Sequence, residues 1–313
     1  MSSIVSILTS SAEIGLVFAA LAMGYYITYT ILDFPDLTVE GSLLFGAVLF
    51  GLSNEWGLPA TLGILFAVIG GSLSGLLTGV LHVKLGIRPL LSGILTSTLL
   101  ITVNLVLTGL GLSGNLLGEE SSISFGRGSS LHLSPLFSFI PSKISGISVR
   151  DPLIYLIIVV ICKIILDAFL RTKRGLLLRA SGSNPTFVTC LGRDSGNDRI
   201  LGLMIGNALA AISGVMYANL SGNVNQGMGV GTVVVGLASL IIGLTVFKGV
   251  KPLSDTTRVI LGAVIYQMTL TVATAIGIPS AYNKMIMAAL FTLALVAGDR
   301  IKKREGSVRN VKA

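Results

Sequence analysis

The sequence predicts an all-α membrane protein with about nine transmembrane helices. Of its 313 residues, 52% are hydrophobic and only 12% are charged, and the mean hydropathy is +0.87. Such a composition leaves too little polar surface to cover a water-soluble core. Several apolar runs also reach the roughly 20 residues that a helix needs to cross a bilayer. Finally, Lys and Arg gather in a few short stretches between those runs, as they do in polytopic membrane proteins.

The expected spans follow the apolar runs in order along the chain. The second span is expected to be discontinuous, because its apolar part, 42–52, is too short to cross roughly 30 Å alone at about 1.5 Å per residue. Three carboxylates and a proline interrupt the chain just before it. A re-entrant segment would raise the count, so the range is roughly eight to ten. The nine spans are expected at residues 14–32, 35–52, 58–81, 89–110, 152–170, 200–220, 232–247, 259–276 and 284–297.

The whole chain, 1–313, is expected to form a single transmembrane domain. The long polar loop at 111–150 leaves room for a short helix on the far membrane surface. The domain divides into a first half at 14–170, a polar segment at 171–199, a second half at 200–297 and a tail at 298–313.

Counting Lys and Arg in the loops predicts the orientation. Six lie in the polar segment at 171–199 and six in the C-terminal tail, whereas none lies at 221–231 or in the first dozen residues. The positive-inside rule then places the N-terminus outside and the C-terminus in the cytoplasm of a bacterial inner membrane. Because these basic residues set topology, the net charge of +8 does not indicate a nucleic acid partner.

Neither a metal site, a cofactor site nor a catalytic centre is expected. His82 and His132 fall on opposite sides of the membrane, and Cys162 and Cys190 lack the paired spacing of metal ligands. The chain contains no Gly-Lys dipeptide and therefore no Walker A loop for ATP. The protein is not expected to be an enzyme, and energy from ATP would have to come from another subunit.

The polar segment at 171–199 is expected to hold a short capped helix. Asn184 is the expected N-cap, Pro185 the first helical residue and Gly192 the residue just past the end. A helix of about two turns is unstable alone in water, so it must dock on something. A loop that served only the positive-inside rule would not need these caps. A second cap, at Asn197 or Asp198, is expected to begin the next span.

Two segments share a pattern typical of inverted repeats with broken helices. They read DLTVEGSLLFGAVLFGL from Asp36 and GMGVGTVVVGLASLIIGL from Gly227, each a polar lead-in before a small-residue-rich helix. Such breaks meet at a site near the membrane midplane. Asp36 and Glu40 would then be functional candidates, unless they only cap a helix at the interface. Asn104, in an apolar span, needs a partner from either a neighbouring helix or a solute.

Small residues also recur at a spacing of four in two spans. They allow close helix packing, either within the subunit or between two copies. The two stripes are Gly71, Gly75 and Gly79, and Gly202, Gly206, Ala210, Gly214 and Ala218.

Several runs of the chain resemble a known family. The run RASGSNPTFVTCLGRD and the following ILGLMIGNALAAISGVMYANLSG resemble the coupling segment and next helix of ABC importer permeases, in the branched-chain amino acid and ribose permease superfamily. The runs FPDLTVEGSLLFGAVL and IRPLLSGILTSTLLITVNLVLTG are similar to its tryptophan/tyrosine-type branch. The resemblance covers residues 14–297. Two departures, apolar Val106 and Leu107 in place of an arginine and Cys190 with Arg193-Asp194 after the coupling helix, leave the solute open.

The resemblance implies partners and site residues. A permease dimer, of two copies or of this chain with a close paralogue, would join an ABC ATPase dimer and receive solute from an extracytoplasmic binding protein. Contact with the ATPase would involve Arg179, Ala180, Gly182, Asn184, Pro185 and Gly192. The translocation path would include Phe34, Asp36, Thr38 and Glu40 from the first break, with Asn104, Asn225, Gly227 and Gly229 added from the second break and the fourth span.

The sequence thus favours the permease of an importer for a small solute such as an aromatic amino acid. The alternative is an ion-coupled secondary transporter driven through Asp36 or Glu40. A membrane scaffold without transport would explain neither the caps nor the broken helices.

Overall fold

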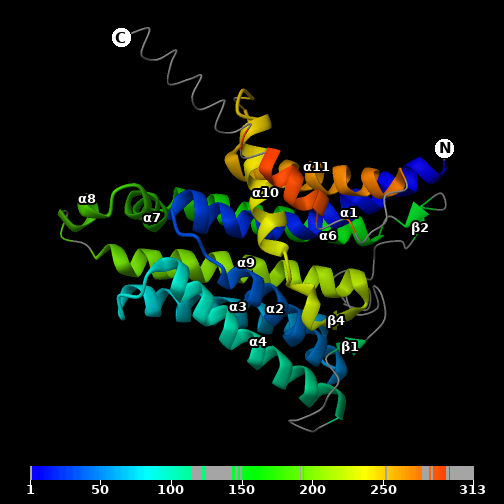
Figure 1. Ribbon diagram of the computed structural model, residues 1–313, viewed down its shortest axis with the longest axis horizontal. Coiled ribbons are helices and arrows are strands. Elements are labelled where there is room, and N and C mark those ends of the chain that lie inside the picture. The colour runs from blue at the N-terminus through cyan, green and yellow to red at the C-terminus, as the bar shows by residue number, and fades with distance from the viewer. Residues whose placement is uncertain are drawn as a thin grey trace.

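The computed structural model is a bundle of helices, as the sequence predicts (Figure 1). Within the part of the chain that it describes, seven helices are long and apolar enough to cross a membrane. That result confirms the all-α membrane fold, while the count of nine spans stays a prediction. The described residues are 2–113, 122–124, 143–144, 147–148, 150–190, 192, 194–250, 252–276, 282, 285–293 and 296.

Most helices start and end within about five residues of the expected spans, but α1 begins at Ser2, well before the expected start at residue 14. The ninth expected span is helical over its described residues 285–293, and the helix expected within 111–150 falls outside the described residues. The helices are α1 (Ser2–Tyr25), its π-helical continuation η1 (Tyr26–Ile31), α2 (Thr38–Glu55), α3 (Ala60–Val83), α4 (Pro89–Ser113), α6 (Arg150–Arg171), α7 (Lys173–Ser183), α8 (Pro185–Cys190), α9 (Ser195–Ser221), the 3-10 turn η2 (Gln226–Met228), α10 (Thr232–Val246) and α11 (Asp255–Ala275).

Four short strands accompany the helices in the described part of the chain. Strand β1 (Ser122–Ser124) pairs antiparallel with β4 (Asn223–Asn225), and β2 (Lys143–Ile144) pairs with β3 (Ile147–Ser148). The β1–β4 pair joins the loop after α4 to the end of α9, at the opposite end of the bundle from α8 (Figure 1).

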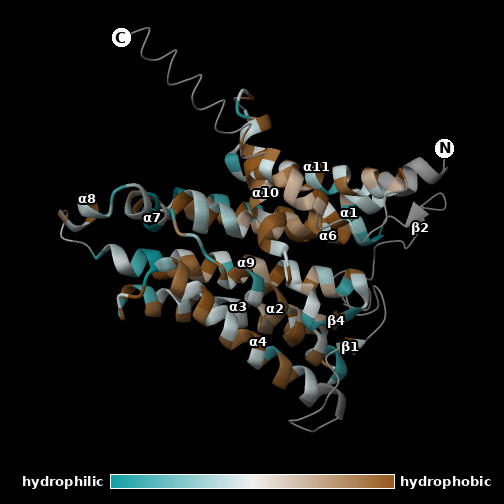
Figure 2. Cartoon of the chain, viewed as in Figure 1, coloured by the Kyte–Doolittle hydropathy of each residue, from teal (hydrophilic) through white to brown (hydrophobic). Residues whose placement is uncertain are grey.

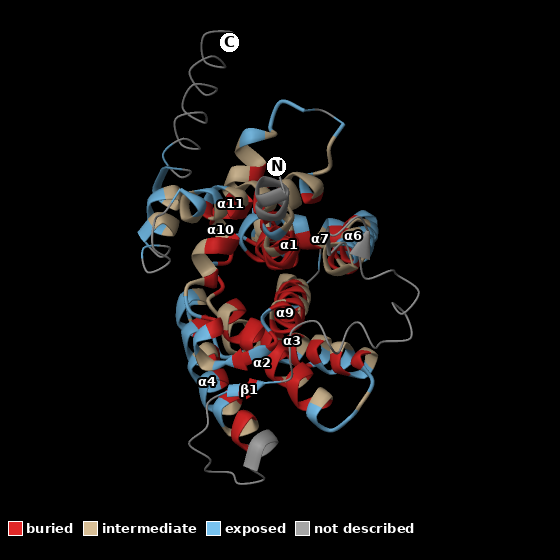
Figure 3. Cartoon of the chain, turned by 90° about the vertical axis from the view of Figure 1, so that its right-hand side faces the viewer, coloured by how far each residue is buried: buried red, intermediate tan, exposed pale blue. Residues whose placement is uncertain are grey.

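Helix α9 lies at the centre of the bundle, between α2 and α3 on one side and α1 on the other (Figure 3). Small residues make this possible. A Cβ on Gly75 would overlap the backbone of Leu203, and one on Gly214 would overlap that of Leu43. Both predicted stripes therefore pack within the subunit, where they let the helix backbones approach closely.

The outer faces of the bundle are apolar. Figure 2 shows hydrophobic residues along α3 and α4, and hydrophilic ones gathered on α7 and the first turns of α9. Apolar side chains on an exposed helix face are typical of lipid contact, because hydrocarbon cannot hydrogen-bond polar groups. Exposed examples are Leu65, Ile69 and Leu73 on α3, Leu91, Leu95 and Ile101 on α4, and Ile161, Ile164 and Ile165 on α6.

The predicted cap at Asn197 or Asp198 is wrong. Helix α9 begins at Ser195, and Asp194 is its N-cap, whose Oδ1 accepts a hydrogen bond from the Gly196 amide at 2.8 Å. Asp198 instead lies in the first turn and accepts a hydrogen bond from Ser181 of α7 at 3.5 Å. The helix starts earlier because the first available carboxylate after the preceding turn captures its free amides.

Candidate functional site

The predicted short helix is present as α8 and is capped as expected. The Asn184 Oδ1 accepts a hydrogen bond from the Phe187 amide at 3.0 Å. Pro185 is the first helical residue. Gly192 follows with φ of +72°, in the left-handed region that glycine adopts without strain. The segment therefore forms a defined helix and not an irregular basic loop.

Helix α7 was not predicted from the sequence. Its N-cap is Thr172, whose Oγ1 accepts from the Gly175 amide at 3.2 Å. The glycine and serine residues in the run lowered its apparent helix propensity, although the threonine before the leucine-rich stretch 176–178 was an available signal. Helices α7 and α8 together form an elbow at one end of the bundle (Figure 1), and we call this pair the elbow.

The elbow is fastened to the end of α1 and leaves part of α8 free. A Cβ on Gly182 would overlap the carbonyl oxygen of Ile31, so the backbones of α7 and η1 are in direct contact. On α8, Val188 is fully buried whereas Phe187 is 56% exposed. One side of the short helix thus docks on the protein, while an aromatic side chain remains available to a partner.

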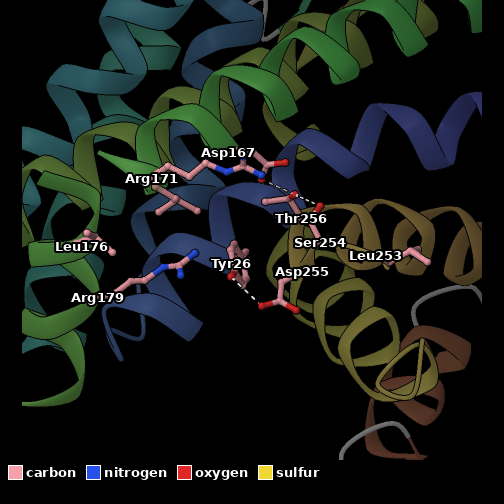
Figure 4. A pocket seen from close by; sticks show the side chains of 10 residues that line it. Tyr26, Asp167, Arg171, Leu176, Arg179, Leu253, Ser254, Asp255 and Thr256 are labelled. Carbon is pink, nitrogen blue, oxygen red and sulfur yellow. Dashed lines mark hydrogen bonds between the residues drawn. The ribbon is translucent and has the colours of Figure 1, made fainter. Parts of the chain in front are cut away.

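A cleft of about 490 Å³ lies between α7 and the start of α11 (Figure 4). Arg179, one of the predicted coupling residues, lines it. The Tyr26 hydroxyl donates to Asp255 at 3.4 Å, and the Thr256 hydroxyl donates to Asp167 at 2.7 Å. These bonds connect η1 and α6 to the first turn of α11 beside the elbow.

The first break, residues 32–37, connects η1, which contacts the elbow, to α2 inside the bundle. Asp33 has φ of +51°, which a non-glycine residue rarely adopts. The buried Phe34 ring meets the ring of His82 edge-on, at 5.2 Å between centroids. Phe34 therefore lies against the end of α3 and anchors the break.

Asp36 lies deep inside the protein and uses both carboxylate oxygens. It is 3% exposed. Its Oδ1 accepts from the Thr38 amide at 2.9 Å, and its Oδ2 accepts from Asn207 Nδ2 at 2.7 Å. Asp36 thus caps the start of α2, and it does so next to the middle of α9, a helix long and apolar enough to cross a membrane. The structure therefore agrees in part with each interpretation of Asp36, as a helix cap and as an acid inside the bundle.

A ladder of buried polar side chains continues from Asp36 and joins α2, α3 and α9. The hydroxyls of Thr38 and Thr78 lie 2.7 Å apart, as do those of Ser42 and Ser74. Ser42 also donates to Asn207 Oδ1 at 2.7 Å. Burying polar groups is favourable only when they are hydrogen-bonded, and this ladder meets that condition. We call it the polar ladder: Asp36, Thr38, Ser42, Ser74, Thr78 and Asn207.

The two breaks meet where α2 and α10 begin. Glu40 Oε1 accepts a hydrogen bond from the Gly231 amide at 2.7 Å. A Cβ on Gly229 would lie 3.0 Å from the Glu40 carbonyl oxygen, so these backbones touch. Asn104 Nδ2 donates to the Gly41 carbonyl at 3.5 Å, so α2 supplies a partner for this nitrogen, while the buried Oδ1 has none among the described residues.

The structure thus gathers only some of the predicted path residues. Glu40, Asn104 and Gly229 lie together, and Asp36 and Thr38 belong to the polar ladder. Phe34 packs at the end of α3, and Asn225 pairs with Ser122 in the β1–β4 strands. Gly227 follows in η2.

Sequence reasoning missed four ladder residues and Gly231. Asn207 is an amide near the middle of the mostly apolar sixth expected span, the same kind of signal that singled out Asn104. Ser74 and Thr78 stand four residues apart and so share one helix face. Nothing local in the sequence shows that Gly231 pairs with Glu40.

Comparison with known proteins identifies relatives along nearly the whole chain. The family model described as "Branched-chain amino acid transport system / permease component" matches residues 3–295. The "Tyrosine transport system permease protein" of Clostridioides difficile (strain R20291) is 38% identical over 299 residues, covering 96% of this chain and 92% of that protein. An uncharacterized protein of Rickettsia prowazekii (strain Madrid E) is 30% identical over 300 residues, covering 94% of this chain and 99% of its own. The solved structure of PsaBC from Streptococcus pneumoniae in complex with Fab aligns with a TM-score of 0.49 at 14% identity, over 92% of this chain and 89% of that one.

Proposed function

Because the chain belongs to the family of branched-chain amino acid transport system permease components, we propose that it is the membrane-spanning subunit of an ABC importer. Its solute would be an aromatic amino acid, in line with the tyrosine transport named for the C. difficile relative. The subunit would lie in a bacterial inner membrane, with its N-terminus outside and its C-terminus in the cytoplasm.

The elbow is the observation that carries this proposal. It holds a capped helix outside the spans, with Phe187 exposed, and it touches the end of η1 at Gly182. A self-contained transporter has no need for such a helix. A subunit driven by a separate ATPase needs one, because force must enter through a rigid element.

The proposed mechanism is alternating access coupled to ATP. Closure of an ATPase dimer would push α8, and α7 would pass the movement to Ile31 and the break that follows it. The break leads directly into the start of α2, where Glu40 meets Gly231 of the second break. A second permease copy or a close paralogue would complete the path, and an extracytoplasmic binding protein would deliver the solute.

Reconstitution tests the proposal. The chain is expressed with the ABC ATPase and the solute-binding protein proposed as its partners, purified and placed in proteoliposomes with radiolabelled tyrosine. We expect the ATPase to co-purify, and uptake to require both ATP and the binding protein. Uptake by the chain alone, driven by a proton or sodium gradient, would instead establish the secondary transporter.

A further inference from the structure

The two acids around the start of α2, Asp36 and Glu40, differ in how their carboxylate oxygens are used. Both oxygens of Asp36 accept hydrogen bonds, and the side chain is fully enclosed. Glu40 is only half-buried, and Oε1 alone accepts a bond, from the Gly231 amide. Within the described residues, Glu40 Oε2 has no hydrogen-bond or ion-pair partner. Glu40 therefore has acceptor capacity left for a ligand, whereas Asp36 has its two oxygens committed.

The position of Glu40 in the bundle makes that free oxygen informative. Asp36 binds Asn207 and Leu43 packs against Gly214, so Glu40 lies at a level between these two contacts along α9. Both α9 residues are well inside this 27-residue helix. A carboxylate at such depth is too costly to face lipid and almost always faces a bundle interior or a water-filled cavity. The open side of Glu40 thus marks the wall of an aqueous path or of a contact with another chain.

We propose that Glu40 Oε2 receives the protonated amino group of the transported solute, and that the protein is therefore selective for solutes carrying a primary ammonium group. This inference rests on the proposed import function and specifies its solute class. An ammonium group is a compact cation with three donors, and its hydrogen bond to a carboxylate is among the stronger ones. The Gly231 amide fixes the other oxygen, so the acceptor is held in place before the solute arrives.

The competing interpretation is that Glu40 only caps the start of α10. The two interpretations order the conservative variants differently. Glu40→Gln keeps the length and an oxygen acceptor for the Gly231 amide but removes the charge. Glu40→Asp keeps the charge but shortens the side chain, which weakens the cap. If Glu40 is only a cap, Glu40→Gln should take up more solute than Glu40→Asp. If Glu40 binds an ammonium group, Glu40→Asp should take up more solute than Glu40→Gln.

The experiment measures ATP-dependent tyrosine uptake by the complete complex of permease, ATPase and binding protein in proteoliposomes. We expect Glu40→Gln to lower the uptake rate at least tenfold in a complex that still assembles, and Glu40→Asp to retain more uptake than Glu40→Gln. The matched control is Glu55→Gln, which removes the same charge from the exposed opposite end of α2 and should leave uptake within twofold.

Two results would overturn the ammonium site. One is uptake by Glu40→Gln within twofold of the wild type, and the other is greater uptake by Glu40→Gln than by Glu40→Asp. If Glu40→Gln does not assemble, the uptake rate of Glu40→Asp relative to the wild type decides. A loss of uptake of at least tenfold in Glu40→Asp, despite normal assembly, contradicts the proposal. Failure of the proposed import function gives a different result, because the wild-type complex itself would then show no ATP-dependent uptake.

Discussion

Gly182 lies so close to Ile31 that an added Cβ would overlap the Ile31 carbonyl oxygen, which leaves no room for a side chain between them. This contact joins the elbow to the last turn of η1, and the first break begins one residue later. A backbone contact therefore connects the elbow, proposed to meet an ATPase, to the segment proposed to line the path.

Replacing Gly182 by Ala should uncouple the elbow from the first break. The added methyl would overlap the Ile31 carbonyl, so α7 or η1 must shift, and overpacking of this kind commonly costs about 1–3 kcal/mol of folding stability. We expect at least tenfold slower uptake with a lower melting temperature. Gly249→Ala is the control, because a Cβ there meets no atom within 4 Å. Equal uptake by the two variants would show that the Gly182 contact is not needed.

Loss of the α8 cap should weaken coupling more than folding. Asn184→Ala leaves the Phe187 amide without its acceptor, and loss of an N-cap costs about 1 kcal/mol of helix stability. Since α8 is only six residues long, we expect it to fray. The measurement is ATP hydrolysis stimulated by the binding protein, which should fall severalfold, while Asn184→Asp retains the cap and the stimulation. A normal response of Asn184→Ala would contradict a role for the capped helix.

The polar ladder should be a main source of stability between α2, α3 and α9. Asn207→Ala leaves Asp36 Oδ2 without its partner and removes one of the two partners of the Ser42 hydroxyl, which keeps Ser74. A buried unsatisfied group costs about 1–3 kcal/mol. We expect a clear drop in melting temperature in detergent. Asn197→Ala, at an exposed position of the same helix, should change little. Similar melting temperatures for both variants would show that the ladder contributes little.

Two buried tyrosines should respond oppositely to loss of the hydroxyl. The Tyr25 hydroxyl has no hydrogen-bond partner in the part of the chain that the structure describes, so Tyr25→Phe should leave stability unchanged or raise it. The Tyr155 hydroxyl donates to Asn219 at 3.1 Å, so Tyr155→Phe should lose about 1 kcal/mol. Thermal unfolding of both variants checks this, and a larger loss for Tyr25→Phe would indicate a partner such as bound water.

Much of the fold could be predicted because its signals are local. The bilayer fixes the length of a span, and the apolar runs show that length directly. The caps of α8 were found because Asn, Pro and Gly act on amides and torsions within a few residues. The start of α9 differs from the prediction because three side-chain acceptors, at 194, 197 and 198, lie close enough to compete for the same backbone amides.

The sequence by itself determined that this chain is a membrane-embedded helical protein, where its helices are broken and which short helix projects from it. Only the tertiary structure decided what each acid does. Asp36 and Asn207 are 171 positions apart, and Glu40 and Gly231 are 191 apart. Their pairing depends on how closely glycine-bearing helices approach, which no local propensity encodes. For that reason two carboxylates that look alike in the sequence have different surroundings. Asp36 is enclosed in the polar ladder, whereas Glu40 keeps one oxygen without a partner among the residues that the structure describes.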